Sequence, residues 1–201
     1  MGHTDATAEQ ARRGFDCGIK HVTHLFNAMR PIHHRDGGAA VAALLEGNVT
    51  CELICDGDHL APDTVRLAYK ILGPNRTVIV TDNLPIAGTA EKSGSFNTAR
   101  IKVRGSTAVR RDGTIVGSVA TMDRHFRNAV SFLDIDIPTA FRLCSTNPAR
   151  VAGVDDRKGR LDHGMDADIV LLDSSLDVAA TVCRGRVAYC REEARLAARA
   201  K

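Results

Sequence analysis

The chain has 201 residues, 44% of them hydrophobic, and its 27 basic and 24 acidic residues give a net charge of +3. This length can bury the core of one domain or slightly more. Basic and acidic residues are interleaved, so we expect no nucleic-acid partner. The longest apolar runs are far shorter than the roughly 20 residues that cross a bilayer, and no apolar leader follows Met1, so we expect no membrane partner. Six cysteines without a CxxC pair predict reduced thiols and a cytoplasmic location.

The first 82 residues predict alternating helices and strands. Thr7-Ala-Glu-Gln10 forms a capping box, which opens a helix that runs to about Cys17 and stops at Gly18. Five further elements follow in strict alternation: a strand at Ile19–Thr23, a helix from Gly37-Gly38 to Glu46, a strand at Val49–Cys55, a helix at Pro62–Leu72 stopped by Gly73-Pro74, and a strand at Thr77–Thr81. This order indicates an α/β fold with a parallel sheet or barrel, whose reactive residues gather at the carboxyl ends of the strands.

The amino-acid composition changes after Leu84. Gly- and Ser-rich turns surround two short β-prone runs, Arg100–Val103 and Thr107–Arg110, which predict a hairpin flap. We expect Gly117–Met122 to open a helix. The later elements are helices at Met122–Phe132 and Pro138–Cys144, a break at Thr146-Asn-Pro148 followed by a short helix, and strands at Ile169–Leu172 and Ala180–Val187. The resulting division is barrel units over 1–155, a small β domain over 156–190 and a charged terminal helix over 191–201.

Two histidines and an aspartate follow predicted strand ends. Imidazole is the commonest zinc ligand, and His3 and His24 are one βα unit apart, so they can converge on one metal. Asp82 ends a third strand and can ligate the metal or act as general base, although an N-cap role is open. With a period of two, His21 and His24 point to opposite faces of their strand, so at most one of them faces the interior.

A second group of side chains predicts an anion site. Arg35 offers a fork that fits phosphate oxygens, and it lies near Asn27, the backbone around Ala28 and, from the next strand, His59. A solvated loop charge is the alternative for Arg35. The sequence contains no GxSxG, P-loop or GxGxxG pattern, which disfavours serine hydrolase, nucleotide hydrolase and dinucleotide-binding functions.

In their order along the chain, these motifs resemble the carboxyl-terminal half of the N-acetylglucosamine-6-phosphate deacetylase family, within the amidohydrolase superfamily. The matching motifs are Gly2-His-Thr-Asp-Ala6, Thr23-His-Leu-Phe-Asn-Ala-Met29, His34-Arg-Asp-Gly37, Asp56-Gly-Asp-His59, Val80-Thr-Asp82, Gly117-Ser-Val-Ala-Thr-Met122, Thr146-Asn-Pro-Ala-Arg150 and the tail from Lys158 to Leu171. The resemblance implies the last three or so βα units of a (β/α)₈ barrel, with part of a small β-sandwich domain at the carboxyl-terminal end.

The resemblance also implies roles for individual residues. His3 and His24 correspond to metal ligands, with zinc as the first expectation and iron, manganese or cobalt as alternatives. Asp82 corresponds to the catalytic acid and base. Asn27, Ala28, His59 and Arg35 correspond to contacts with the sugar phosphate, Arg35 reaching across a homodimer interface. The implied reaction is hydrolysis of the N-acetyl group of N-acetylglucosamine 6-phosphate, which gives glucosamine 6-phosphate and acetate.

The chain departs from the family at its front. Family members carry about as much chain again before the position of His3, including a metal-binding glutamate, a carbonyl-polarising histidine and the first barrel strands. Three strands cannot close a barrel. We therefore expect a fragment, a mis-assigned gene start or half of a split protein. The alternatives to an active deacetylase are an inactive or partner-dependent remnant and an amidohydrolase that acts on a cyclic amide.

Overall fold

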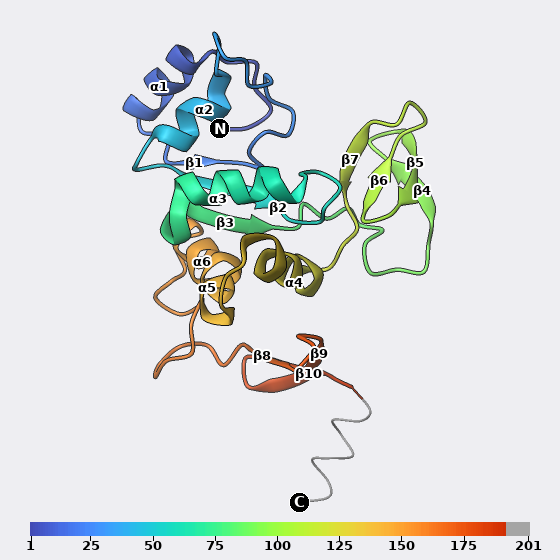
Figure 1. Ribbon diagram of the computed structural model, residues 1–201. Coiled ribbons are helices and arrows are strands. Elements are labelled where there is room, and N and C mark those ends of the chain that lie inside the picture. The colour runs from blue at the N-terminus through green and yellow to red at the C-terminus, as the bar shows by residue number, and fades with distance from the viewer. Residues whose placement is uncertain (192–201) are drawn as a thin grey trace, which may run out of the picture.

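The computed structural model describes residues 1–191, which form three separate sheets and the helices that connect them (Figure 1). The predicted terminal helix over 192–201 lies outside the described residues. The first region contains α1 (Ala8–Asp16), β1 (His21–Val22), α2 (Gly38–Leu45), β2 (Thr50–Ile54), α3 (Pro62–Arg76) and β3 (Thr77–Val80). The second contains β4 (Ser93–Phe96), β5 (Ala99–Arg104), β6 (Thr107–Val109) and β7 (Ile115–Ser118). The third contains α4 (Met122–Leu133), α5 (Ile137–Phe141), the π-helical turn η1 (Arg142–Thr146), α6 (Asn147–Val151), β8 (Ile169–Leu172), β9 (Val178–Cys183) and β10 (Arg186–Cys190).

The first sheet is parallel, with the strand order β1-β2-β3, as the alternating pattern predicts. Val22, Cys51 and Leu53 are fully buried and belong to the main core, which α1, α2 and α3 complete. All three strands run toward the sheet formed by β4–β7, so their carboxyl ends meet at that edge (Figure 1). Each of the predicted site residues lies before or beyond these strands, in the segments that connect them to the helices.

Local sequence explains where the helices begin and end. The Thr7 hydroxyl accepts the Gln10 N–H at 3.2 Å, and the Gln10 side chain accepts the Thr7 N–H at 2.9 Å, which confirms the predicted capping box. Gly73 has a φ of 68° inside α3, so the regular helix stops there, at the predicted position. A left-handed residue followed by Pro74 cannot continue an α-helix.

The predicted flap is larger than a hairpin. The strands β4–β7 form a four-stranded antiparallel sheet with its own small core of Leu84, Ile101 and Ala108 (Figure 1). The outer strands, β4 and β7, carry Gly and Ser where an alternating apolar pattern would be needed to recognise them. The helix predicted over Met122–Phe132 is confirmed as α4, which begins at the last residue of the Gly117–Met122 segment; the first two residues of that segment, Gly117 and Ser118, still belong to β7.

The predicted break at Thr146-Asn-Pro148 is a change of helix type and not an interruption of the helical chain, and the predicted short helix is present there as α6. The chain continues from α5 through η1 into α6, because the wide π turn accommodates Pro148 at the start of α6. Asn147 is buried there, and its side-chain amide donates to the carbonyls of Pro74 at 2.8 Å and Thr77 at 2.7 Å. The motif therefore fastens these helices to the beginning of β3.

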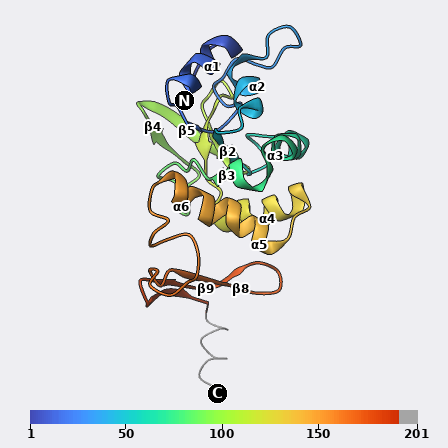
Figure 2. The same cartoon turned by 90° about the vertical axis from the view of Figure 1, so that its left-hand side faces the viewer.

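The last strands form a separate antiparallel sheet with the order β10-β9-β8, below the helices α4–α6 in both views (Figures 1 and 2). The predicted single run Ala180–Val187 is divided between β9 and β10 by a turn at Arg184-Gly185, where both residues have positive φ. A sandwich partner for this sheet stays a prediction. Among residues 1–191, no helix combines the length and the apolar character that crossing a membrane would require.

Arg76 joins the carboxyl ends of two helices. Its guanidinium donates to the carbonyls of Leu44 at 2.9 Å and Glu46 at 2.7 Å, where α2 ends, and to that of Ile71 at 3.0 Å within α3. Helix ends leave carbonyls without intrahelical partners, and a cation there is also favoured by the helix dipole. The Arg76 side chain therefore supplies hydrogen-bond donors to backbone carbonyls of both α2 and α3.

Replacing this side chain tests its contribution. We expect Arg76→Met to lower the free energy of unfolding by about 2 kcal/mol, since hydrogen bonds from a charged group are worth about 1.5–3 kcal/mol. The exposed Lys70 on the same helix provides the control, and Lys70→Met should stay within about 0.5 kcal/mol of the wild type. Urea unfolding followed by circular dichroism measures both. Equal stability of the two variants would contradict the role of Arg76.

Candidate active site

The structure brings the two predicted metal ligands into contact. His24 follows β1 and is 6% exposed, whereas His3 precedes α1 and is exposed, and their ring centroids are 4.8 Å apart with the planes at 72°. The segment that carries His3 runs parallel to the segment after β1, with a bridge between Thr4 and Met29. The two histidines therefore leave adjacent parallel segments on the same side, as successive barrel strands require.

His24 has an unused nitrogen. Its Nδ1 atom is buried and has no hydrogen-bond partner within residues 1–191, and a buried polar atom of this kind normally has one. A metal would supply a partner, and two adjacent imidazoles fit as part of a zinc-type donor set. The set is partial, since the described residues contain no cluster of three or more His, Cys, Asp or Glu side chains with metal-binding geometry.

Several predicted site residues share an unusual backbone. His3, His24, Ala28 and Asp82 have φ values of 45°, 28°, 52° and 49°. For residues other than glycine this conformation costs of order 1–3 kcal/mol and collects at functional sites, where surrounding contacts hold it. Side-chain patterns in the sequence give no signal for it. Two of these residues, His24 and Asp82, lie two residues beyond the ends of β1 and β3, where the regular strand conformation stops.

Asp82 lies beyond β3 and is exposed at the foot of the β4–β7 sheet. Its carbonyl accepts the Ser118 N–H at 3.0 Å, and the Ser118 carbonyl accepts the Leu84 N–H at 3.0 Å. Ser118 is buried and is the last residue of β7. The backbone at Asp82 and Leu84, where the chain enters the β4–β7 sheet, is therefore hydrogen-bonded to Ser118, where the chain leaves that sheet, while the Asp82 carboxylate stays accessible.

His59 is held by a carboxylate that sequence analysis did not single out. The Asp56 side chain is fully buried; its Oδ2 is 2.6 Å from His59 Nδ1, and its Oδ1 accepts the N–H groups of Asp58 and His59. Burial alone raises the pKa of Asp56, but the hydrogen bonds from His59 and Asp58 outweigh it and hold that pKa below its usual value. The Asp-x-x-His spacing is the signal that identifies this turn.

The remaining predicted anion-site residues are spread along one loop. The Asn27 amide lies 3.4 Å from the His24 carbonyl and 3.3 Å from that of Leu25, which folds the loop back onto the strand end. Ala28 and Arg35 are exposed, and an Arg35 guanidinium nitrogen lies 2.6 Å from His34 Nε2. The structure places Asn27 beside His24 but shows no contact of Arg35 with Asn27, Ala28 or His59.

Arg30, which sequence analysis did not identify, holds this loop in place through salt bridges. Its guanidinium binds Asp5 through two hydrogen bonds of 3.0 Å and Asp36 through one of 2.6 Å. Asp5 belongs to the segment that follows His3, and Asp36 precedes α2. The pair of salt bridges ties the His3 segment to the far end of the candidate phosphate loop, and no local charge pattern indicates this pairing.

A buried histidine on α4 holds the end of β2. His125 is fully buried, its Nδ1 accepts the Cys55 N–H at 3.1 Å, and the neighbouring Asn128 amide donates to the Cys55 carbonyl at 2.7 Å. Because Nδ1 accepts, Nε2 carries the proton of this neutral ring. Cys55 lies beyond the end of β2 and directly before Asp56, and these two side chains take the place of a neighbouring strand as hydrogen-bond partners of its backbone.

Comparison with known proteins shows the family of the chain. A family model described as the amidohydrolase family matches residues 1–188, so the chain belongs to the amidohydrolase family. N-acetylglucosamine-6-phosphate deacetylase of Bacillus subtilis is 36% identical over 194 residues, which are 96% of this chain and 49% of the relative. The human protein of the same name is 34% identical over 203 residues, with 97% and 49% covered.

Solved structures give the same picture. An N-acetylglucosamine-6-phosphate deacetylase from Thermotoga maritima has a TM-score of 0.88 at 35% identity, covering 94% of this chain and 52% of its own. A variant of the Mycobacterium smegmatis deacetylase, in complex with N-acetyl-D-glucosamine 6-phosphate, has a TM-score of 0.87 at 38% identity and covers 92% and 50%. The chain spans about half the length of the curated relatives it matches.

The buried His125 predicts a pH effect on stability. Burial lowers its pKa to about 4, against an opposing effect of Asp56, whereas an unfolded histidine has a pKa of about 6.5. Between these values the unfolded chain binds a proton that the folded chain refuses, so the free energy of unfolding falls as the pH falls from 6.5 to 4. The loss attributable to His125 is at most about 3 kcal/mol.

Denaturant unfolding at pH 7, 5.5 and 4 measures this loss. His125→Asn keeps an acceptor that does not titrate, so we expect its stability to fall less than that of the wild type over the interval. The exposed His163 is the control, and His163→Asn should follow the wild-type curve. Parallel curves for the wild type and His125→Asn would contradict the assignment.

Proposed function

We propose that the protein is a hydrolase that removes the N-acetyl group of N-acetylglucosamine 6-phosphate in the cytoplasm, and that its three parallel strands are part of a (β/α)₈ barrel. The observation that carries the proposal is the contact between His3 and His24, with the buried His24 Nδ1 left without a partner. The names of the relatives at 34–36% identity supply the substrate class. The products are glucosamine 6-phosphate and acetate.

In this proposal His3 and His24 hold a divalent metal, with zinc first and iron, manganese or cobalt as alternatives. When bound, such a metal acts as a Lewis acid toward the amide carbonyl and acidifies a water molecule. Asp82 accepts a proton from the attacking water and then delivers it to the leaving amine nitrogen, as the C–N bond breaks. The exposed carboxylate and the backbone held by Ser118 are suited to this transfer.

The substrate phosphate is bound on the other side of the site. Asn27, the backbone at Ala28, His59 and Arg35 contribute to this side, and Asp56 fixes the His59 ring through Nδ1, which leaves Nε2 to face the ligand. Arg35 acts from a partner subunit in a homodimer, which accounts for its exposed position away from its own Asn27 and His59. A cyclic-amide substrate is not favoured: two solved structures with other names, a β-aspartyl dipeptidase and an enamidase, are 20% and 16% identical to this chain and share only the fold with it.

Acetate release tests the reaction. With zinc and N-acetylglucosamine 6-phosphate, we expect the purified protein to release acetate, and we expect Asp82→Asn to lower kcat at least about 100-fold, the usual contribution of a general acid or base. Asp112→Asn, which alters another exposed carboxylate, should keep wild-type kcat. Zinc and substrate binding without any acetate would favour the partner-dependent alternative, and absence of both kinds of binding would reject the proposal.

The role of Arg35 is tested separately through KM. Hydrogen bonds to charged groups are worth about 1.5–3 kcal/mol, so we expect Arg35→Ala to raise KM for the phosphorylated sugar at least about 10-fold. KM for unphosphorylated N-acetylglucosamine should stay unchanged, and Arg12→Ala, at an exposed site on α1, should alter neither value. An equal increase for both sugars would show that Arg35 supports the loop rather than the phosphate.

A further inference from the structure

Glu52 contacts the strand end that carries His24 in three ways. It lies in the middle of β2, and its Oε2 accepts the His24 N–H at 3.1 Å. Its own carbonyl accepts the Leu25 N–H at 2.9 Å. Its Oε1 is 2.9 Å from Nε2 of His21, whose Nδ1 is 2.8 Å from the Thr50 hydroxyl.

These contacts occur where the regular sheet no longer supports the chain. The strand β1 consists of only two residues, and its pairing with β2 ends at Val22 and Cys51. His24 lies two residues beyond that last pair and has a φ of 28°. A backbone in this conformation persists only when its surroundings hold it, and the Glu52 carboxylate is the side chain that does so at the His24 amide.

Both carboxylate oxygens of Glu52 have a partner. The His24 N–H donates to Oε2, and Oε1 lies 2.9 Å from His21 Nε2. The side chain of Glu52 is therefore fixed from two sides. His21, which the period of two places on the opposite face of the strand from His24, is the side chain that orients Glu52.

We propose that Glu52 is a positioning residue for the metal site: by holding the His24 amide it presents the buried imidazole to His3, and it thereby sets the affinity for a divalent metal. This inference rests on the proposed function, since it takes His3 and His24 as the ligands. Groups that orient metal ligands commonly change metal affinity about 10–100-fold when they are removed. Here the orienting bond runs through the main chain of the ligand instead of its ring.

Zinc titration by calorimetry, with no substrate present, tests the proposal on the full chain. We expect Glu52→Ala to weaken zinc binding at least about 10-fold and His24→Ala to abolish it. Glu52→Gln keeps an oxygen for the His24 amide and a second polar group for His21, so it should remain within about threefold of the wild type. Thr50→Val removes the contacts of the Thr50 hydroxyl with His21 and with the Lys20 carbonyl but none with His24, so it should also stay within about threefold.

Circular dichroism and urea midpoints establish that each variant is folded. If Glu52→Ala is not folded, Glu52→Asp replaces it, because the aspartate side chain is too short to reach both His24 and His21. The same weakening of zinc binding, at least about 10-fold, is then expected of Glu52→Asp. Zinc affinity of Glu52→Ala within threefold of wild type would overturn the inference while leaving the metal site intact. So would a loss in Glu52→Gln as large as in Glu52→Ala, which would show that charge and not position matters, or a comparable loss in Thr50→Val. Absence of zinc binding in the wild type would overturn both the inference and the metal site of the proposed function.

Discussion

The candidate site depends on sharp turns of the backbone where parallel strands end. His24 and Asp82 leave β1 and β3 with φ values of 28° and 49°, and His3 has a φ of 45° beside them. At His3 and His24 the two rings come into contact, with centroids 4.8 Å apart. Because the conformation is costly for residues other than glycine, every turn requires hydrogen bonds from another part of the chain.

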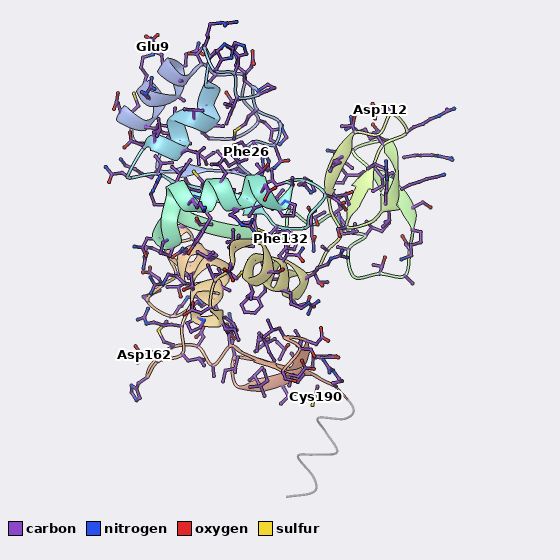
Figure 3. All side chains as sticks on the ribbon, in the orientation of Figure 1. Glu9, Phe26, Asp112, Phe132, Asp162 and Cys190 are labelled. Atoms are coloured by element: carbon purple, nitrogen blue, oxygen red, sulfur yellow. The ribbon has the colours of Figure 1, made fainter. Side chains whose placement is uncertain are left out.

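At two of these turns the hydrogen bonds come from different elements: a carboxylate of β2 holds the His24 amide, and the last residue of β7 holds the Asp82 carbonyl. At the end of β2, α4 in the same way holds both backbone groups of Cys55. Side chains come together on both sides of the first sheet, with Phe26 above β2 and β3 and Phe132 below them in Figure 3. The precision of the site is therefore a property of the packed layers and not of the loops alone.

Sequence patterns predicted the parts of this structure that local chemistry determines. The Thr7–Gln10 capping box, the stop at Gly73-Pro74 and the three parallel strands all depend on short-range propensity and alternation. The contact of His3 with His24 also agrees with the pattern, because consecutive parallel strands end on the same side. Tertiary contacts decide what these patterns do not show: Ser118 pairs with Asp82, so that Gly117 and Ser118 belong to a strand, and Asn147 donates to carbonyls 73 and 70 residues away.

The period-two argument about His21 shows the same limit more sharply. It assumes an extended strand through residue 24, whereas β1 ends at Val22 and the positive φ of His24 turns the next residues in a new direction. His21 faces Glu52, and Glu52 contacts His24, so the two histidines act on one group although their rings are separate. A sequence can assign residues to a face only while the backbone stays regular, and catalytic residues lie where that regularity ends. For this chain the informative sequence signal is consequently the motif order, which fixes which strand ends meet, and not the orientation of any single side chain.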